Sequence, residues 1–443
     1  MTLPRLSVIG LGKLGLTTAA CFASRNFEVV GVDVVESNVK AINRGECPIA
    51  EPGLAELLAR CRGRLRATTD AGEAVGGSDV TFIIVPTPSG PDGAFSNDSV
   101  LDVLDAIGPA LRAKAGFHIV VVTSTVMPGT MRGVVAPRLE ELTGKTCGRD
   151  FGLAYNPEFI ALGSIIRDFL NPDMVLIGES DARTGDVLED IYTRACDNSP
   201  YIARMNWINA EVTKLGLNCY VTTKISFANS MAELCERIEG ADASVVTAAI
   251  GHDSRVGGKY LRPGLGFGGP CFPRDNIAFI KCAADRGMAA KLARAVVEVN
   301  DEQVARVVRK VRAAAAPGSR VAVLGLSYKP GSHVVEASQP VEIVRRLLSN
   351  GYRVRAYDPQ VKALPGDAAD GQGAEIVSSV DACLAGADCC VIATAWEEFG
   401  RLGRGELQSR IRPEAIIDCW KVLERPKGMS AAGGLCTGQE GRR

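Results

Sequence analysis

Three closely spaced glycines follow the first apolar segment of the chain and constrain its fold more than any other feature. Gly10, Gly12 and Gly15 come directly after Leu6–Ile9, and Asp33 closes the next apolar segment. A glycine turn between a strand and a helix, with an acidic residue about 20 positions on, is typical of dinucleotide-binding units. The alternative is a purely structural turn in which Asp33 is a solvated strand end.

Each part of this pattern has a physical role in holding a dinucleotide. The first glycine permits a tight turn, the second lets backbone N–H groups approach a pyrophosphate at the helix N-terminus, and the third allows close packing. The carboxylate of Asp33 would accept hydrogen bonds from a ribose and repel a 2′-phosphate, which favours NAD over NADP. The residues expected to bind NAD here are Gly10, Leu11, Gly12, Lys13, Leu14, Gly15 and Asp33.

Composition limits the class of protein. The 443 residues carry 50 basic and 51 acidic side chains, a formal charge of −1, so we expect no nucleic-acid partner. No apolar run is long enough to cross a membrane, so no membrane partner is expected. The 14 cysteines form no CxxC pattern, so we expect reduced thiols, no metal site and a cytoplasmic location.

Short apolar segments alternate with helical patterns and predict an α/β protein. Val80–Val85 and His118–Thr123 are apolar enough for strands buried on both faces of a sheet. The stretch from Met205 to Glu236 contains almost no glycine or proline, which predicts one long helix. Arg320–Leu324 then opens a second series of strands and helices.

These patterns predict a fold class and a division into domains. The expected fold is α/β, with two Rossmann-like doubly wound domains joined by a long central helix. We place the NAD-binding domain at residues 1–200, a central helical domain at 201–300 and a second Rossmann-like domain at 301–425. The remaining residues, 426–443, are rich in glycine, serine and charge, and we expect them to lack fixed structure.

Cys271 has the sequence setting of a nucleophile. It follows the glycine-rich segment Gly264–Pro270 and precedes Pro273, a residue favoured in the first turn of a helix. A helix N-terminus at this point would stabilise a thiolate. Asp275, four residues later, would lie on the same side of that turn. For the other cysteines, apolar packing is the expected role.

Other polar residues have spacings suited to catalysis. Lys214 and Asn218 are four residues apart in the predicted long helix, so a cation and an amide would project together and could hold an oxyanion. The alternative for Lys214 is a surface ion pair with Glu211. Glu158 follows a short strand and could act as a general base, whereas a carboxylate in a turn is more often simply solvated.

Taken together, these segments resemble the nucleotide-sugar 6-dehydrogenases, the family of the UDP-glucose, GDP-mannose and UDP-N-acetylhexosamine dehydrogenases. The likeness runs from Leu6 to about Leu423. The segments that carry it are Gly10–Leu16, Pro48–Leu54, Val85–Pro88, Ser124–Thr130, Asn156–Phe159, Lys214–Asn229, Gly264–Asp275, Gly325–Lys329 and Tyr357–Pro359.

The resemblance implies a four-electron oxidation of a sugar CH₂OH group to a carboxylate by two successive NAD⁺. Cys271 would capture the intermediate aldehyde as a thiohemiacetal, a second oxidation would give a thioester, and water would release the acid with Glu158 as base. A covalent thiol suits this chemistry because it holds the aldehyde between the two oxidations. The implied catalytic residues are Cys271, Lys214, Asn218, Asp275, Glu158 and Thr125.

The resemblance also implies binding residues and an assembly. Further NAD contacts are expected from Pro86, Thr87, Thr125, Glu158 and Arg274. The nucleotide sugar is expected to contact Glu158, Phe159, Ile160, Ala161, Lys214, Asn218, Arg255, Tyr260, Leu261, Arg262, Pro263, Gly264, Gly268 and Lys329. Dimerisation and catalysis would fall to residues 201–300 and nucleotide-sugar binding to 301–425. We expect a homodimer or higher homo-oligomer formed through the long helix, with Arg255 reaching the neighbouring subunit's site.

The chain departs from the family pattern at several positions. Glu336 stands where family members carry an arginine that contacts NAD, so the charge beside a pyrophosphate is reversed. The other departures are Asn38, Leu162, His333, Val334 and Asp418-Cys419-Trp420. We therefore expect weak NAD binding or a rearranged loop in the third domain, with the Cys271 chemistry retained.

Several hypotheses about function stay open. Arg255–Leu261 resembles the UDP-glucose enzymes and favours that substrate, whereas Arg262–Gly264 and Thr184–Asp186 resemble the GDP-mannose enzymes. A UDP-N-acetylhexosamine is a further alternative. A two-electron hydroxyacid dehydrogenase would need neither the thiol nor a third domain. A non-catalytic nucleotide-sugar-binding homologue is conceivable because of Glu336.

Overall fold

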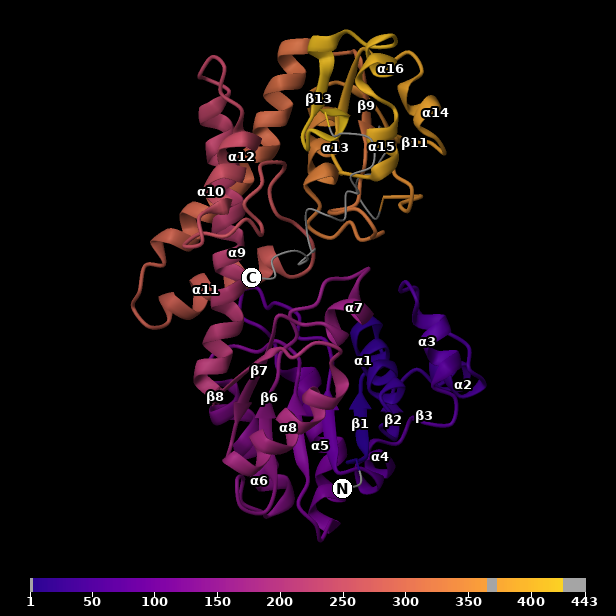
Figure 1. The fold of residues 1–443 in the computed structure, drawn as a ribbon, viewed down its shortest axis with the longest axis vertical. Coiled ribbons are helices and arrows are strands. Elements are labelled where there is room, and N and C mark those ends of the chain that lie inside the picture. Colours follow the sequence, from indigo (N-terminus) through magenta and orange to yellow (C-terminus); the bar gives the residue numbers. More distant parts are fainter. Residues whose placement is uncertain (1–2, 365–372, 425–443) are drawn as a thin grey trace. The chain divides into compact units, whose positions relative to one another are not determined.

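The computed structural model describes residues 3–364 and 373–424. The chain forms two compact units that divide after Gly216. Each unit is built on one β-sheet with helices packed against it (Figure 1). The predicted α/β fold with two Rossmann-like sheets is therefore confirmed. The tail predicted at 426–443 lies outside the described residues.

The first unit contains an eight-stranded sheet in the order β3-β2-β1-β4-β5-β6-β7-β8. Neighbouring strands are parallel except for β6 and β7. The strand order reverses beside β1, and a dinucleotide binds at such a reversal in this type of sheet. The strands are β1 (Leu6–Ile9), β2 (Val29–Val32), β3 (Leu65–Thr68), β4 (Val80–Ile83), β5 (Ile119–Val122), β6 (Gly152–Tyr155), β7 (Met174–Glu179) and β8 (Tyr201–Asn206).

Helices bury both faces of this sheet, as its apolar strands predict. Val120 and Val121 are adjacent on β5, yet they pack into different core clusters. One cluster contains α1, α2, α3, α7 and α8, and the other contains α4, α5, α6 and the π-helical turn η1. The bounds are α1 (Lys13–Ser24), α2 (Glu36–Arg44), α3 (Leu54–Arg60), α4 (Ala71–Gly77), α5 (Asp98–Ala113), η1 (Met131–Val135), α6 (Ala136–Thr143), α7 (Ile165–Leu170) and α8 (Ala182–Ala195).

The predicted long helix is present as α9 (Trp207–Cys235). It begins two residues later than predicted because Met205 and Asn206 still pair with β7 as the end of β8. Its last residue precedes the predicted end, Glu236, by one position. The division between the two units falls within α9, so this helix carries residues of both.

The second unit contains a five-stranded parallel sheet in the order β11-β10-β9-β12-β13. This order matches that of the first five strands of the other sheet, in agreement with the prediction of two Rossmann-like domains. Gly325 follows β9 with φ +101°, and Gly10 follows β1 with φ +95°, so both turns use a left-handed glycine. The strands are β9 (Arg320–Leu324), β10 (Arg353–Tyr357), β11 (Glu375–Ile376), β12 (Cys389–Ile392) and β13 (Ile416–Asp418).

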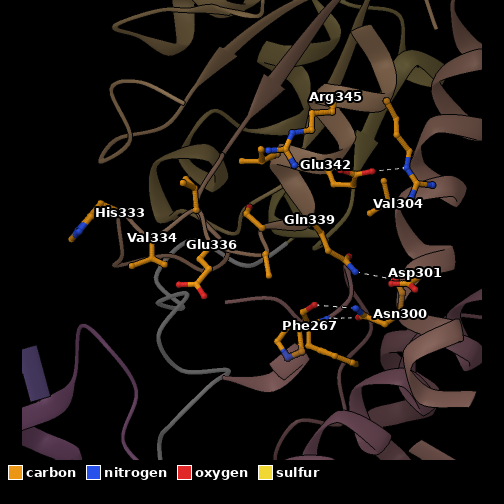
Figure 2. A pocket seen from close by; sticks show the side chains of 16 residues that line it. Phe267, Asn300, Asp301, Val304, His333, Val334, Glu336, Gln339, Glu342 and Arg345 are labelled. Atoms are coloured by element: carbon orange, nitrogen blue, oxygen red, sulfur yellow. Dashed lines mark hydrogen bonds and ion pairs between the residues drawn. The ribbon is translucent and has the colours of Figure 1, made fainter. Parts of the chain in front are cut away.

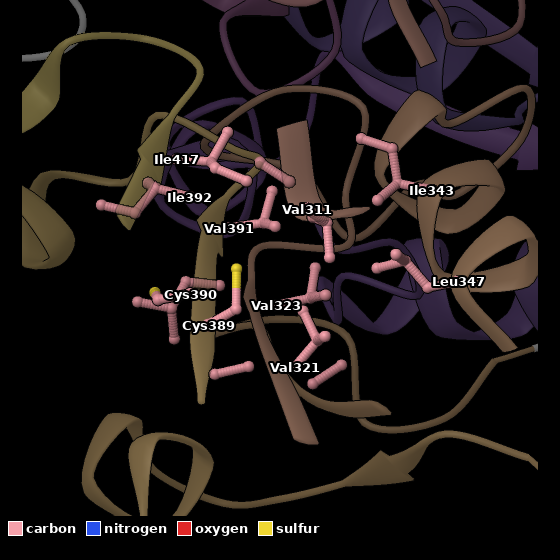
Figure 3. Close-up of a cluster of buried hydrophobic side chains, with 14 of the residues drawn as sticks. Val311, Val321, Val323, Ile343, Leu347, Cys389, Cys390, Val391, Ile392 and Ile417 are labelled. Carbon is pink, nitrogen blue, oxygen red and sulfur yellow. The ribbon is translucent and has the colours of Figure 1, made fainter. Parts of the chain in front are cut away.

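A continuous apolar core fills this second unit. Figure 3 shows Val321 and Val323 of β9 among residues of β12 and of the packed helices. Burial raises the pKa of the Cys389 thiol to about 12, which suits the packing role expected of such cysteines. The helices are α10 (Ala243–His252), α11 (Phe272–Ala284), α12 (Lys291–Ala314), α13 (Gln339–Ser349), α14 (Val380–Leu384), α15 (Glu397–Arg401) and α16 (Arg404–Gln408), with 3₁₀ turns η3 (Pro413–Ala415) and η4 (Val422–Glu424). Among the helices of residues 3–364 and 373–424, none is long and apolar enough to cross a membrane.

Candidate functional site

The glycines of the turn after β1 have two kinds of surroundings: Gly10 and Gly15 are closely packed, whereas Gly12 faces open space. A Cβ atom on Gly15 would lie closer than 3.0 Å to the carbonyl oxygen of Gly10, and one on Gly10 would meet the carbonyl of Ile84. Gly12 is exposed, and a Cβ there would meet nothing within 4 Å. Helix α1 begins at the next residue, so the open surface lies at a helix N-terminus, where N–H groups favour an anion.

Asp33 closes this turn from the end of β2. Its Oδ2 accepts a hydrogen bond from the Leu11 N–H at 3.0 Å, and its Oδ1 accepts one from the Val35 N–H at 2.8 Å. Asp33 is half-buried rather than a solvated strand end. Its position beside the open glycine turn therefore fits the adenosine side of a dinucleotide.

The corresponding turn of the second unit is closed. Asp358 is 1% exposed, and its Oδ2 accepts hydrogen bonds from Leu326 N–H, Ser327 N–H and the Trp396 indole. The carboxylate is used within the fold, so the open dinucleotide cradle belongs to the first unit.

Glu158 lies in a loop that the first unit holds firmly. The neighbouring Asn156 donates from Nδ2 to the Leu176 carbonyl at 2.8 Å, and Tyr192 donates to its Oδ1. The Oε1 of Glu158 is shielded from solvent and accepts no hydrogen bond from the described residues. Burial raises the pKa of Glu158 to about 7, while the charge of Lys214 opposes part of that rise.

Lys214 lies against the same loop. It is 7% exposed, donates to the Glu158 carbonyl oxygen, and has its Nζ 4.6 Å from the centroid of the Phe159 ring. The alternative of a surface pair with Glu211 is wrong, because Glu211 is fully buried. Its carboxylate instead accepts hydrogen bonds from Gly129 N–H at 2.6 Å and Met131 N–H at 2.8 Å.

Thr125 and the Pro86-Thr87 segment lie side by side in the first unit. The Thr87 hydroxyl donates to the Thr125 carbonyl at 2.7 Å. The hydroxyl of Ser124 accepts from Val85 N–H at 2.9 Å. Glu211 holds the loop that follows Thr125. The structure therefore joins two segments that the sequence separates by almost 40 residues.

Sequence reasoning assigned no role to Glu51. Its carboxylate accepts hydrogen bonds from Gly163 N–H at 3.1 Å and Ile165 N–H at 3.0 Å. These two groups lie just after Phe159, Ile160 and Ala161, which are all half-buried. The only sequence signal was the presence of Glu51 in the family-like segment Pro48–Leu54.

Cys271 occupies the N-cap position of α11, so the thiol lies at a helix N-terminus as predicted, with Pro273 in the first turn. Among the thirteen free cysteines in the described part of the chain, it is the exposed one. Asp275 is 1% exposed and accepts a hydrogen bond from Asn218, and its Oδ1 lies 3.6 Å from Nε of Arg274. The second unit thus brings Asn218 and Asp275 together one helical turn from the thiol.

The remaining predicted binding residues of this unit surround the glycine-rich segment. Arg255 is highly exposed and forms an ion pair with Asp253 at 2.7 Å. Tyr260 has φ +62°, and its ring packs edge-on against Phe272. The others vary in exposure: Leu261 and Gly268 are buried, Arg262 is exposed, and Pro263, Gly264 and Lys329 are half-buried.

A cavity of about 930 Å³ lies beside this segment within the second unit (Figure 2). Glu336 lines it together with Asp301 and Glu342, and Glu342 is bonded to Arg346 at 2.9 Å. Glu336, where the expected positive charge is reversed, therefore places an exposed carboxylate at the wall of this cavity. In residues 3–364 and 373–424 no cluster of three or more His, Cys, Asp or Glu side chains is arranged to hold a metal ion.

Comparison with known proteins covers most of the chain. Residues 4–196, 208–302 and 322–425 match the NAD binding, central and UDP binding domains of the UDP-glucose/GDP-mannose dehydrogenase family. The chain is 38% identical to UDP-glucose 6-dehydrogenase of Haloferax volcanii over 96% of this chain and 98% of that protein. It is 38% identical to GDP-mannose 6-dehydrogenase of Pseudomonas putida over 81% of each chain.

A solved structure shows the same likeness. The UDP-glucose dehydrogenase from Pyrobaculum islandicum superposes with a TM-score of 0.86 at 37% identity, covering 96% of both chains. The match of residues 4–196 to an NAD binding domain agrees with the open glycine cradle and with Asp33. NAD is thus the cofactor that the first domain accommodates.

Alanine at Gly12 and at Gly15 should have opposite effects. We expect Gly12→Ala to leave the free energy of unfolding within about 0.5 kcal/mol of wild type and to weaken NAD binding at least about tenfold, because its methyl group occupies the open approach. Gly15→Ala should lower stability by about 1–3 kcal/mol through the clash with Gly10. Denaturant unfolding measures the stability of each variant, and calorimetric titration measures its affinity for NAD. Wild-type NAD affinity in Gly12→Ala would contradict this assignment.

Proposed function

Because this chain belongs to the UDP-glucose/GDP-mannose dehydrogenase family, we propose that it oxidises the C6 hydroxymethyl group of a nucleotide sugar to a carboxylate. The observation that carries the proposal is the exposed Cys271 at the N-terminus of α11, in a chain that matches all three family domains. NAD⁺ held at the Gly10–Gly15 turn and Asp33 would accept one hydride in each of two oxidations, so the overall change would be four electrons.

Cys271 supplies the covalent step. Its Sγ forms a bond to C6 of the aldehyde, the thiol proton ends on the aldehyde oxygen, and the product is a thiohemiacetal. Loss of a second hydride and of the hydroxyl proton leaves a thioester. Attack by water forms the C6–O bond, breaks the C6–S bond and returns the thiol. The position of Cys271 at a helix N-terminus supports this role because N–H groups there stabilise a thiolate.

Polar residues of α9 and α11 suit the charge that develops on the C6 oxygen. Asn218 is oriented by its hydrogen bond to Asp275, and Lys214 lies one turn earlier on the same helix. An amide and a cation held in this way lower the energy of an oxyanion without reorganising during the reaction. We assign Thr125 to the positioning of water.

Glu158 is the proposed base for thioester hydrolysis. Its pKa of about 7, raised by burial, lets it take a proton from water near neutral pH and release it again. A fully solvated carboxylate would be too weak a base for this step.

UDP-glucose is the proposed substrate. The likeness to the Haloferax UDP-glucose 6-dehydrogenase spans more of the chain than the likeness to the Pseudomonas GDP-mannose 6-dehydrogenase, at equal identity. GDP-mannose and a UDP-N-acetylhexosamine are the alternatives. The free cysteines of the described residues support the proposed cytoplasmic location.

An apolar stripe on α9 supports the proposed homodimer. Tyr220, Phe227 and Leu234 are seven residues apart, so they share one helix face, and they are 62%, 48% and 48% exposed. Large side chains exposed in a row favour burial against a second copy of the helix. Arg255, exposed and close to the substrate loop in sequence, is the residue proposed to reach the neighbouring site.

Replacing the thiol tests the covalent step. Cys271→Ser should lower formation of the carboxylate product at least about 10³-fold, because a hydroxyl is a far weaker nucleophile at neutral pH. Cys282→Ser, on the same helix, is the matched control and should retain activity. The measurement is chromatography of the acid formed from UDP-glucose. Acid formation at the wild-type rate by Cys271→Ser would exclude the proposed mechanism.

The pH profile tests the base. Below its pKa Glu158 is protonated and cannot accept a proton, so kcat should rise as pH increases through about 7 and then level off. Glu158→Gln should lose this rise and remain slow from pH 5.5 to 8.5. An unchanged profile in Glu158→Gln would assign the titration to another group.

Charge reversal at Glu336 tests its effect on the cofactor. Glu336→Arg should tighten NAD binding about tenfold or more, because an arginine can pair with the pyrophosphate where a carboxylate repels it. Glu239→Arg, an exposed site with the same charge change, is the control. Calorimetric titration with NAD is the measurement, and equal affinity in Glu336→Arg and wild type would show that Glu336 lies away from the cofactor.

A further inference from the structure

The glycine-rich segment before Cys271 has no regular secondary structure of its own. Residues 259–270 lie between α10 and α11 and form neither helix nor strand. Leu265 and Phe267 are nevertheless 3% and 5% exposed, so the backbone between them runs through the interior of the second unit. Buried N–H and C=O groups without partners are costly, and a segment of this kind must find them elsewhere.

Three buried carboxamides supply those partners. Asn229 of α9 is 1% exposed, accepts from Gly264 N–H at 2.9 Å and donates to the Leu265 carbonyl at 3.2 Å. Asn300 of α12 is 8% exposed, accepts from Phe267 N–H at 2.7 Å and donates to the Phe267 carbonyl at 3.1 Å.

The third carboxamide, Gln339, is the first residue of α13 and links this helix to α12 and to the glycine-rich segment. Gln339 is 8% exposed, accepts from Gly266 N–H at 2.7 Å and donates to the Asn300 carbonyl at 2.9 Å. Figure 2 shows Asn300 between Phe267 and Gln339 at the edge of the cavity. Each carboxamide acts as donor and acceptor at once, which neither a carboxylate nor an apolar side chain can do.

The glycines of this segment fit tightly around these contacts. A Cβ atom on Gly266 would lie closer than 3.0 Å to Asn300 Oδ1 and to Gln339 Nε2. A Cβ on Gly268 would collide with the carbonyl of Ala337 in the segment before α13. These glycines are therefore explained by close packing, in contrast to Gly12, whose surroundings are open.

We propose that Asn229, Asn300 and Gln339 are positioning residues that hold the 264–267 backbone and thereby set the position of the Cys271 thiol. Three residues separate Phe267 from Cys271, and two of them, Gly268 and Gly269, pack against Ala337 and Tyr328. Because this connection is short, fixing the backbone at Phe267 also limits where the first turn of α11 can lie. Productive attack on an aldehyde depends on such placement, since a displacement of about 1 Å can lower the rate about 100-fold.

Gln339 also joins two of the domains that the family comparison distinguishes. It lies in the part of the chain that matches the UDP binding domain, whereas Asn229, Asn300 and Cys271 lie in the part that matches the central domain. A single side chain therefore fastens the thiol segment of one domain to the other within the second unit. This inference rests on the proposed role of Cys271, but the hydrogen bonds can be tested without any substrate.

The test compares Gln339→Leu, Asn300→Leu and Gln339→Glu with wild type. Gln339→Glu is nearly isosteric and keeps the acceptor for Gly266 N–H, so it remains informative if a leucine variant does not fold. Gln303→Leu is the matched control, because Gln303 is 3% exposed on α12 and, within residues 3–364 and 373–424, its amide bonds to Val299 and Arg306 of its own helix and to no other group. The readouts are hydrogen exchange of the peptide covering 264–271, iodoacetamide alkylation of Cys271 followed by mass spectrometry, and steady-state kinetics.

The expected pattern is specific to positioning. Both leucine variants should exchange the 264–267 amides at least about tenfold faster and alkylate Cys271 about threefold more slowly, because the thiol leaves the helix N-terminus. Their kcat should fall about tenfold or more at an unchanged KM for nucleotide sugar, with partial recovery in Gln339→Glu and none of these changes in Gln303→Leu.

Two outcomes would overturn the proposal. Unchanged exchange at 264–267 would show that the carboxamides do not hold the segment. Faster exchange with wild-type alkylation and wild-type kcat would show that they hold it without positioning the thiol. If the proposed covalent role of Cys271 were wrong, acid formation would persist in Cys271→Ser. Hydrogen exchange and alkylation of wild type and the carboxamide variants would still report on the carboxamides.

Discussion

Buried and half-buried polar side chains that satisfy the backbone of irregular loops are the interaction on which the candidate site residues depend. Glu51 holds the loop after Ala161, Glu211 holds the loop after Thr125, and Asn229, Asn300 and Gln339 hold the segment before Cys271. Loops at the ends of parallel strands carry the chemistry in this kind of fold, but they cannot bond to themselves as helices and sheets do. Each anchor therefore replaces missing secondary structure with one or two side-chain hydrogen bonds.

The two Rossmann-like units show how one topology can take different roles. Both begin with a strand, a left-handed glycine and an acidic residue at the end of the second strand. In the first unit Gly12 is open and Asp33 is half-buried, so a dinucleotide has room and an acceptor. In the second unit Asp358 is bonded to Leu326, Ser327 and Trp396 and is buried. The same pattern there stabilises the fold instead of forming a second dinucleotide cradle.

Local patterns in the sequence predicted the elements well and the loop anchors poorly. The predicted segments Leu6–Ile9 and Arg320–Leu324 match β1 and β9, because an apolar run bounded by turn residues has few alternatives to a buried strand. The spacing of Glu211 and Lys214 allowed a surface ion pair, yet Glu211 is buried. Its hydrogen-bond partner Gly129 lies 82 positions earlier in the sequence. Glu51 reaches across 112 positions in the same way. Such contacts follow from the packed fold and cannot be predicted from the spacing of residues along the chain.

We propose that one active site carries out two successive oxidations on one carbon and holds the aldehyde between them as a covalent adduct of Cys271, which the second oxidation converts to a thioester. The stoichiometry of NADH to nucleotide sugar tests it most directly, with limiting UDP-glucose, GDP-mannose or UDP-N-acetylhexosamine and excess NAD⁺. We expect two NADH and one carboxylate for each molecule of the accepted sugar nucleotide, with UDP-glucose as that substrate. One NADH for each sugar, or nucleotide-sugar binding with no NADH at all, would contradict it.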